Sequence, residues 1–170
     1  MARILLVDDE PSILSVLSTL MKAEGHEPVS ALGGDKAREI LLTDSFDLMI
    51  SDIRMTPVDG MELLRLARRD RPGMAVIMLT AYGSVETAVE AMKEGAFDYV
   101  TKPFKVDELL ITVQRSLEYT RMRDENEDLR KQLDTRYGFE NIVAESPAMR
   151  KVCDMVRRVA AGPGAATPYD

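Results

Sequence analysis

Residues 4–12 read ILLVDDEPS and place three consecutive acids directly after an apolar run of four residues. The apolar run predicts a buried β-strand, and Pro11 suits the first turn of a helix that follows it. Like charges this close repel, and a carboxylate beside a buried strand is costly to desolvate unless a positive group compensates it. The stretch therefore predicts a strand, an acidic turn and a helix, with a cationic partner for the acids elsewhere in the chain.

The rest of the chain repeats this alternation of strands and helices. Short apolar runs predict strands at residues 3–7, 27–31, 46–51, 74–79 and 97–101. Between them, Asp59 or Gly60 opens one helix, Ser84 is a candidate N-cap, and Gly95 suits a left-handed position after a helix. Units of this length are typical of an α/β fold with a doubly wound, five-stranded parallel sheet and helices on both faces.

Polar side chains gather at the predicted carboxyl ends of these strands, where open parallel sheets bind ligands. They are Asp8, Asp9, Asp52, Thr80 and Lys102. Several carboxylates in one small concavity suit Mg²⁺, which shares the rest of its coordination with water and phosphate. A metal between Asp9 and Asp52 leaves one Asp52 oxygen able to attack phosphorus. Lys102 would neutralise the phosphoryl oxygens and Thr80 would donate its hydroxyl to one of them, so the set predicts an acyl phosphate on Asp52.

Residues 1 to about 118 resemble a response-regulator receiver domain of two-component signalling. The resemblance rests on the order, spacing and strand positions of Asp8, Asp9, Asp52, Thr80, Tyr99, Lys102 and Pro103. It implies a flavodoxin-like sheet of strand order 2-1-3-4-5 and phosphoryl transfer from a sensor histidine kinase to Asp52. It also implies that Thr80 and Tyr99 act as switch residues. A cis peptide bond before Pro103 would aim Lys102 at the site.

The resemblance further implies a set of metal ligands. Mg²⁺ is expected on Asp9, Asp52 and the backbone carbonyl of Arg54, with Asp8 acting through water. The loop after Asp52 departs from the family pattern, which commonly reads xxMPxMDG, because IRMTPVDG has Thr56 before its proline. We therefore expect the backbone beside the acceptor to differ locally from that of the family.

A phosphatase of the haloacid dehalogenase type is the alternative function. That family also uses a nucleophilic Asp after a strand, with Thr or Ser, Lys and Mg²⁺. It needs a second Asp two positions after the nucleophile as general acid, and this position holds Arg54. The sequence therefore favours a regulatory phosphoacceptor, which catalyses only its own phosphorylation and dephosphorylation and is not otherwise an enzyme.

A helical pattern continues from residue 105 past the receiver-like part, through SLEYTRMRDENEDLRKQLDT, without Gly or Pro. Its a and d heptad positions hold Tyr119, Met122, Asn126, Leu129 and Leu133. In this register Glu118 of one chain faces Arg123 of a parallel partner, and the next heptad repeats the opposite-charge pairing. The pattern favours a coiled-coil linker helix over residues 119–136 in a parallel homodimer, assisted by contacts between receivers. A single amphipathic helix lying on its own domain is the alternative.

Residues 137–160 contain IVAESPAMRKV, which resembles the opening of the AAA+ ATPase domain of NtrC-type, sigma-54-dependent transcriptional activators. No GxxxxGK[ST] phosphate-binding loop occurs in the chain, so the ATPase domain is expected to be incomplete. Residues 161–170, rich in Gly, Pro and Ala, are typical of a flexible tail or an engineered remnant. We therefore expect a fragment, or a naturally shortened form, of such an activator.

Composition limits the partners and the compartment. The net charge of −7 argues against a nucleic-acid or anionic-membrane surface, since both need a basic footprint. Cys153 is the single cysteine, which excludes an internal disulfide and fits a reducing compartment. The chain starts without a signal peptide and contains no apolar stretch of bilayer-spanning length. A cytoplasmic protein that itself binds neither nucleic acid nor membrane is the expectation.

Overall fold

A computed structural model describes residues 1–81, 85–137 and 147–160. The chain divides into two compact units, Met1–Glu125 and Asn126–Asp170. Within the described residues, no helix is both long and apolar enough to span a bilayer.

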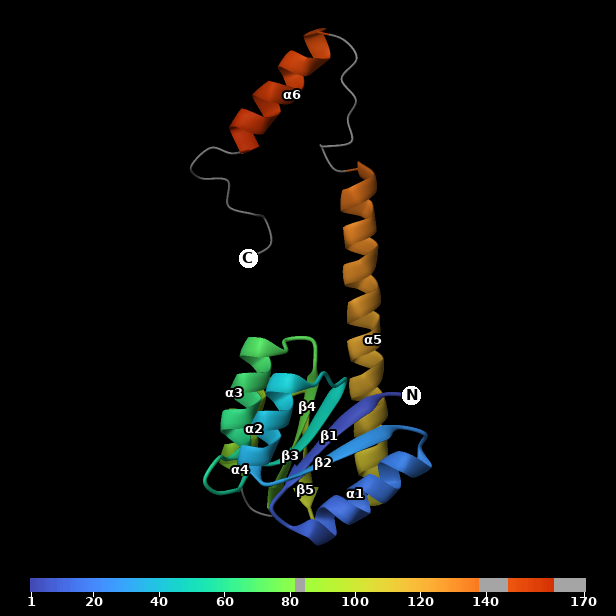
Figure 1. Cartoon of the computed structure of the whole chain (residues 1–170), viewed down its shortest axis with the longest axis vertical. Helices are drawn as coiled ribbons and strands as arrows, with labels where there is room; N and C mark the ends of the chain where they lie inside the picture. The colour runs from blue at the N-terminus through green and yellow to red at the C-terminus, as the bar shows by residue number, and fades with distance from the viewer. Residues whose placement is uncertain (82–84, 138–146, 161–170) are drawn as a thin grey trace. The chain divides into compact units, whose positions relative to one another are not determined.

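The first unit contains a five-stranded sheet of order β2-β1-β3-β4-β5, in which every neighbouring pair is parallel (Figure 1). The strands are β1 Arg3–Asp8, β2 Glu27–Leu32, β3 Leu48–Asp52, β4 Ala75–Ala81 and β5 Asp98–Lys102. The predicted flavodoxin-like order 2-1-3-4-5 is confirmed. Strand order reverses between β1 and β3, and such a reversal opens a crevice at the carboxyl ends of the strands.

Helices cover both faces of this sheet. They are α1 Pro11–Ala23, α2 Gly34–Thr43, α3 Gly60–Asp70, α4 Val85–Lys93 and α5 Val106–Tyr137, and the second unit adds α6 Pro147–Ala160. One apolar core lies between the sheet and α2, α3 and α4, and the other lies between the sheet and α1 and α5. Alternate residues of one strand supply the two cores, since Leu5 and Val7 enter the first and Ile4 and Leu6 the second.

The helix signals read from the sequence are confirmed where the structure describes them. Pro11 begins α1. The Asp59 side chain caps α3 by accepting a hydrogen bond of 2.8 Å from the Glu62 N–H. Gly95 follows α4 with φ +94°, the left-handed conformation in which glycine avoids a Cβ clash. Ser84, the candidate N-cap of α4, lies outside the described residues.

The strand boundaries differ from the predicted ones at the carboxyl ends. β1, β3, β4 and β5 each run one or two residues further than expected, so that Asp8, Asp52, Thr80 and Lys102 lie within the strands. The predicted strands ended where the apolar residues end. Backbone pairing continues past that point, for example between Thr80 and Thr101. Asp8, Asp52 and Lys102 are therefore held by the sheet itself and not by loops.

Helix α5 continues without a break for 32 residues, as the sequence predicted. Its buried face within the first unit is formed by Leu109, Thr112, Val113, Ser116 and Thr120. The predicted a and d side chains Tyr119, Met122, Leu129 and Leu133 are each more than half exposed, and Asn126 is exposed as well. Tyr119, Met122, Leu129 and Leu133 thus form an exposed apolar stripe on α5, separate from the buried face of the helix.

Candidate functional site at the carboxyl edge of the sheet

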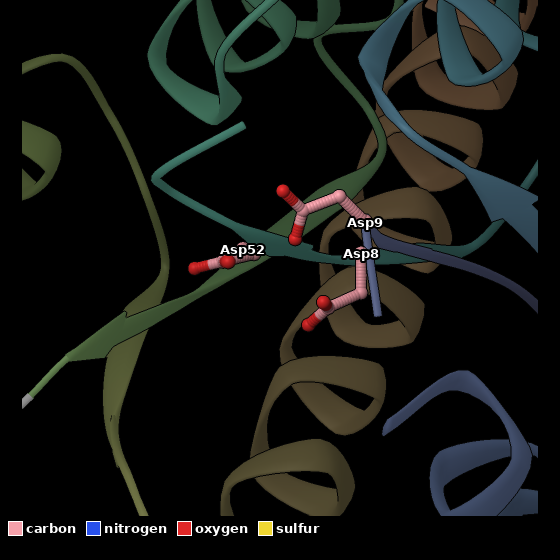
Figure 2. A group of neighbouring side chains, drawn as sticks. All are labelled: Asp8, Asp9 and Asp52. Carbon is pink, nitrogen blue, oxygen red and sulfur yellow. The ribbon is translucent and has the colours of Figure 1, made fainter. Parts of the chain in front are cut away.

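Three acids converge where β1 and β3 end. Asp8 and Asp52 are the last residues of their strands, and Asp9 follows β1 directly. Each offers a carboxylate oxygen, and these oxygens lie within 4.8 Å of one another. Figure 2 shows the three side chains turned toward a common space. The structure thus brings together the acidic residues that the sequence predicted for one site.

Lys102, the last residue of β5, is the cation that joins two of these acids. Its Nζ donates to Asp8 Oδ2 at 2.7 Å and lies 3.2 Å from Asp52 Oδ2. The Asp8 carboxylate is fully buried, and its Oδ1 also accepts a hydrogen bond of 2.9 Å from the Glu10 N–H. Lys102, 94 residues away from Asp8, is therefore the cationic partner that the three acids of ILLVDDEPS predicted. The Lys102–Pro103 peptide bond is cis, as expected.

Burial and neighbouring charges shift the protonation of this pair. Burial raises the pKa of Asp52 above that of an ordinary aspartate; the Lys102 ammonium opposes this rise and the Asp8 carboxylate adds to it. Burial by itself would lower the pKa of Lys102, but the hydrogen bond to Asp8 and the charges of both acids outweigh it and raise that pKa. Lys102 is therefore firmly protonated, and the Asp52 anion depends on nearby cations.

The three acids differ in their access to solvent. Asp8 and Asp52 are buried, whereas Asp9 is exposed. Beside Asp9 lies an open cleft of about 510 Å³, whose lining includes Arg54, Thr56, Arg65 and Glu90. The charged lining of this cleft is mixed, since the arginines Arg54 and Arg65 face the acids Asp9, Asp59 and Glu90.

The loop after β3 holds the backbone of Asp52 in place. The Arg54 N–H lies 3.4 Å from Asp52 Oδ1, and the Gly60 N–H donates to the Ile53 carbonyl at 2.9 Å. A Cβ atom on Gly60 would overlap the backbone carbonyl of Asp52. Sequence reasoning treated Gly60 only as a helix start and missed this second role. The dipeptide Asp59–Gly60 signals a turn, but the close approach of its backbone to Asp52 depends on packing that sequence does not reveal.

The two predicted switch residues lie on neighbouring strands. Thr80 is buried on β4, and its hydroxyl donates to the Ala81 carbonyl at 3.3 Å. Tyr99 lies on β5 and is 41% exposed. In the pairing of these two strands Thr80 lies opposite Thr101 and Tyr99 lies opposite Met78, so the two residues are neighbours across the sheet but are not paired with each other.

A large groove of the first unit lies away from these residues. It measures about 980 Å³ and runs beside α5, with a lining that includes Met1, His26, Leu110, Gln114 and Arg121. None of the site residues contributes to it. The chemistry of the carboxylates and Lys102, and not the size of a cavity, identifies the functional site.

Comparison with known proteins identifies relatives of this chain. The family model described as "Response regulator receiver domain" matches residues 4–114. Among curated proteins, the regulatory protein AtoC of Escherichia coli K12 is 40% identical over 158 residues, covering 93% of this chain and 34% of that protein. The transcriptional regulatory protein ZraR of Klebsiella oxytoca is 37% identical over 157 residues, covering 92% of this chain and 34% of that protein. The chain therefore spans about a third of the length of these relatives.

Solved structures give a matching result. A response regulator receiver domain protein from Clostridium thermocellum superposes with a TM-score of 0.67 at 35% identity, covering 72% of this chain and 98% of that chain. NtrX from Brucella abortus, in complex with ADP, superposes with a TM-score of 0.72 at 33% identity, covering 94% of this chain and 34% of that chain. The first match spans a whole receiver domain, and the second extends over the linker region of a longer protein.

Proposed function

Since this chain belongs to the response regulator receiver domains, the phosphorylation-dependent switches of two-component signalling, we propose that it accepts a phosphoryl group on Asp52 from a sensor histidine kinase. The single observation that carries this proposal is the convergence of Asp8, Asp9 and Asp52 within 4.8 Å, with Lys102 beside them. The comparisons give no support to a phosphatase of the haloacid dehalogenase type, and Arg54 stands where that family needs its second Asp.

The residues present fit Mg²⁺. Carboxylate oxygens are its preferred protein ligands, and the exposed Asp9 leaves room for the water that this ion retains. We assign Asp9, Asp52 and the backbone carbonyl of Arg54 as direct ligands. Asp8 acts through water, since one of its oxygens is already bonded to Lys102 and the other to the Glu10 N–H. When bound, the ion supplies positive charge against the phosphoryl oxygens.

The Asp52 carboxylate acts as nucleophile. One of its oxygens forms a bond to phosphorus while the bond from phosphorus to the donor breaks, and the bonding electron pair leaves with the donor. Lys102 stays anchored to Asp8 at 2.7 Å and turns its remaining N–H groups to the oxygens of the transferred group. Asp8 is therefore a positioning residue, which holds the ammonium at the site before and after transfer.

Phosphorylation is relayed through Thr80 and Tyr99. The Thr80 hydroxyl, now directed at the Ala81 carbonyl, turns to a phosphoryl oxygen, because a charged acceptor forms the stronger hydrogen bond. The space that it leaves on β4 lets the Tyr99 ring move inward from its exposed position on the neighbouring strand. The surface around β5 and α5 thereby changes with the state of Asp52.

The output is a change in dimerisation. The exposed stripe of Tyr119, Met122, Leu129 and Leu133 suits a parallel coiled coil, with Asn126 setting the register. We assign residues 1–118 to the receiver, 119–136 to the linker coil, 137–160 to the start of an AAA+ domain and 161–170 to a flexible tail. Of these ranges, residues 138–146 and the whole of 161–170 lie outside the described residues. Relatives named as transcriptional regulatory proteins support a role in transcription regulation. We propose that this dimer controls a sigma-54 activator ATPase in the cytoplasm.

The acceptor is tested by incubating the chain with Mg²⁺ and acetyl phosphate and measuring its intact mass. We expect one added phosphoryl group, which is absent when Mg²⁺ is omitted and absent in Asp52→Asn. Asp59→Asn is the matched control, since asparagine also caps a helix and the residue lies in the same loop region. Labelling of Asp52→Asn at the level of the parent would refute the assignment.

A further inference from the structure

The arginine Arg123 on α5 reaches back to the receiver at a point beyond the family match, which ends at residue 114. Its Nη1 donates to the Pro72 carbonyl at 2.8 Å, in the turn between α3 and β4. Its Nη2 contacts Asp124 Oδ1 at 3.1 Å, so the neighbouring carboxylate balances its charge. The Arg123 side chain is 30% exposed, whereas the charged side chains at residues 124–131 of α5 are exposed.

Gly73 makes room for this guanidinium. A Cβ atom on Gly73 would lie 2.6 Å from Arg123 Nη2, closer than real Cβ contacts come. No other neighbour is that close, since the next atom is the Arg123 Cζ at 3.8 Å. Among the described residues, the space over Gly73 is therefore filled by the Arg123 side chain, which lies 50 residues further along the chain.

Other contacts around residues 116–120 also hold this part of α5 against the receiver. The buried face of α5 continues to Ser116 and Thr120, whose hydroxyls bond to carbonyls of their own helix and leave its surface flat. The Tyr119 ring lies 5.6 Å from the Phe97 ring. The Arg68 guanidinium donates to the Met74 carbonyl of the same turn, and burial followed by the charge of Arg123 lowers the pKa of Arg68. Repulsion between the two guanidiniums keeps the contact easy to open.

From these contacts we propose that Arg123, the Pro72 carbonyl and Gly73 form a clamp, which fastens α5 to its own receiver and withholds the Arg123 side chain from a second copy of this chain. In the coiled-coil register, Arg123 occupies the e position that faces Glu118 of the partner chain. The side chain can lie over Gly73 or extend to that glutamate. This second part of the proposal rests on the dimer put forward above, and the clamp itself does not.

The substitution Gly73→Ala opens the clamp without disturbing the fold. The added methyl group meets the far end of a flexible side chain and no backbone atom within 4 Å, so Arg123 moves and the receiver does not. Below the dimer dissociation constant, we expect amide hydrogens of residues 118–125 to exchange about threefold to tenfold faster in Gly73→Ala, the effect of one lost hydrogen bond of ordinary net strength. Unchanged exchange in this segment would overturn the clamp.

Sedimentation equilibrium tests the competition. We expect Gly73→Ala to tighten the dimer about twofold to fivefold, the size of an exposed ion pair. The same substitution should have no effect on the dissociation constant in an Arg123→Ala background. In an Arg121→Ala background it should act as in the parent, since exposed Arg121 pairs only with Glu125 on its own helix among the ion pairs of the described residues. An equal effect of Gly73→Ala with and without Arg123 contradicts the competition.

The two measurements separate the clamp from the proposed function. If the parent and Gly73→Ala both stay monomeric at every concentration, the dimer and the competition are wrong, and the exchange rates alone decide the clamp. Labelling of Asp52 by acetyl phosphate should be the same in the parent and in Gly73→Ala, because the turn at Pro72 lies at the opposite end of β4 from Thr80.

Discussion

At the scale of single residues, the site is a balance between burial and charge. Asp52 must be ionised to attack phosphorus, yet burial favours its protonated form. Lys102 lowers this cost but is shared with Asp8, to which it is closer. A further cation would therefore stabilise the ionised form of Asp52. The exposed Asp9 is the acid that such a cation can reach from solvent.

We expect Asp52→Asn to stabilise the fold by about 1–2 kcal/mol at neutral pH, because it removes a buried charge while Lys102 keeps its partner Asp8. The pKa of Asp52 is raised in the folded state, so its favourable contribution is complete below the pKa of an unfolded aspartate and is lost as the pH rises through the folded-state pKa. The difference in unfolding free energy between Asp52→Asn and the parent should thus grow as the pH rises from the unfolded-state pKa through the folded-state pKa of Asp52. Urea unfolding at acidic and neutral pH measures it, and a less stable Asp52→Asn at neutral pH would contradict this balance.

Mg²⁺ should stabilise the parent against unfolding by about 1.4 kcal/mol when its free concentration is about ten times the dissociation constant. Asp9→Asn should lose most of this gain without a change in metal-free stability, because Asp9 is exposed. Glu10→Gln is the matched control, since it removes the next acid in the chain, which does not belong to the group of converging carboxylates. Thermal melting with and without Mg²⁺ tests this. Equal losses of stabilisation in the two variants would remove Asp9 from the metal site.

At the scale of elements, strand ends and helix starts decide where the site residues lie. The predicted strands placed every site residue near the correct edge, because the switch from apolar to polar residues marks that edge in parallel sheets. Whether Asp8 or Asp9 would be buried did not follow from the sequence, since both are adjacent acids after one apolar run. The pairing of Asp8 with Lys102 and the approach of Gly60 to Asp52 were equally hidden, because they join residues that only the folded chain brings together.

Gly60→Ala should destabilise the fold by about 1–3 kcal/mol and slow phosphorylation, because the new methyl group has to displace the backbone that carries Asp52. Gly73→Ala is the matched control, since the same methyl group there meets the far end of the Arg123 side chain and no backbone atom within 4 Å. Urea unfolding and the rate of labelling by acetyl phosphate give the two readouts. If both variants are equally stable and equally fast, Gly60 has no role in holding the site.

Helix α5 makes the dimer testable by shortening the chain. A chain that ends after Glu125 keeps the first unit and Arg123 but lacks Asn126, Leu129 and Leu133. We expect it to be monomeric at concentrations where the full chain is dimeric, and a chain that ends after residue 118 should behave alike. Light scattering gives the mass of each form. The same oligomeric state in all three would refute the coiled coil.

At the scale of the whole molecule, the chain contains a receiver domain and a long helix that continues beyond the family match. Its relatives are about three times its length, and the match to them runs through the linker region. The sequence predicted the receiver family and its fold because both are marked by a few polar residues at fixed strand ends. It could not reveal the Arg123 clamp, because a lone arginine at a heptad e position has the same pattern whether it faces a partner chain or its own domain.

The most direct test of the account is the chemical identity of the phosphorylated residue. After incubation with acetyl phosphate and Mg²⁺, borohydride reduces an acyl phosphate of aspartate to homoserine, which peptide mass spectrometry locates. We predict homoserine at position 52 and at no other acid, with Asp8 and Asp9 unchanged. Homoserine at another position, or a phosphoryl group that resists reduction and lies on a hydroxyl, would contradict the central claim that Asp52 is the acceptor of this receiver.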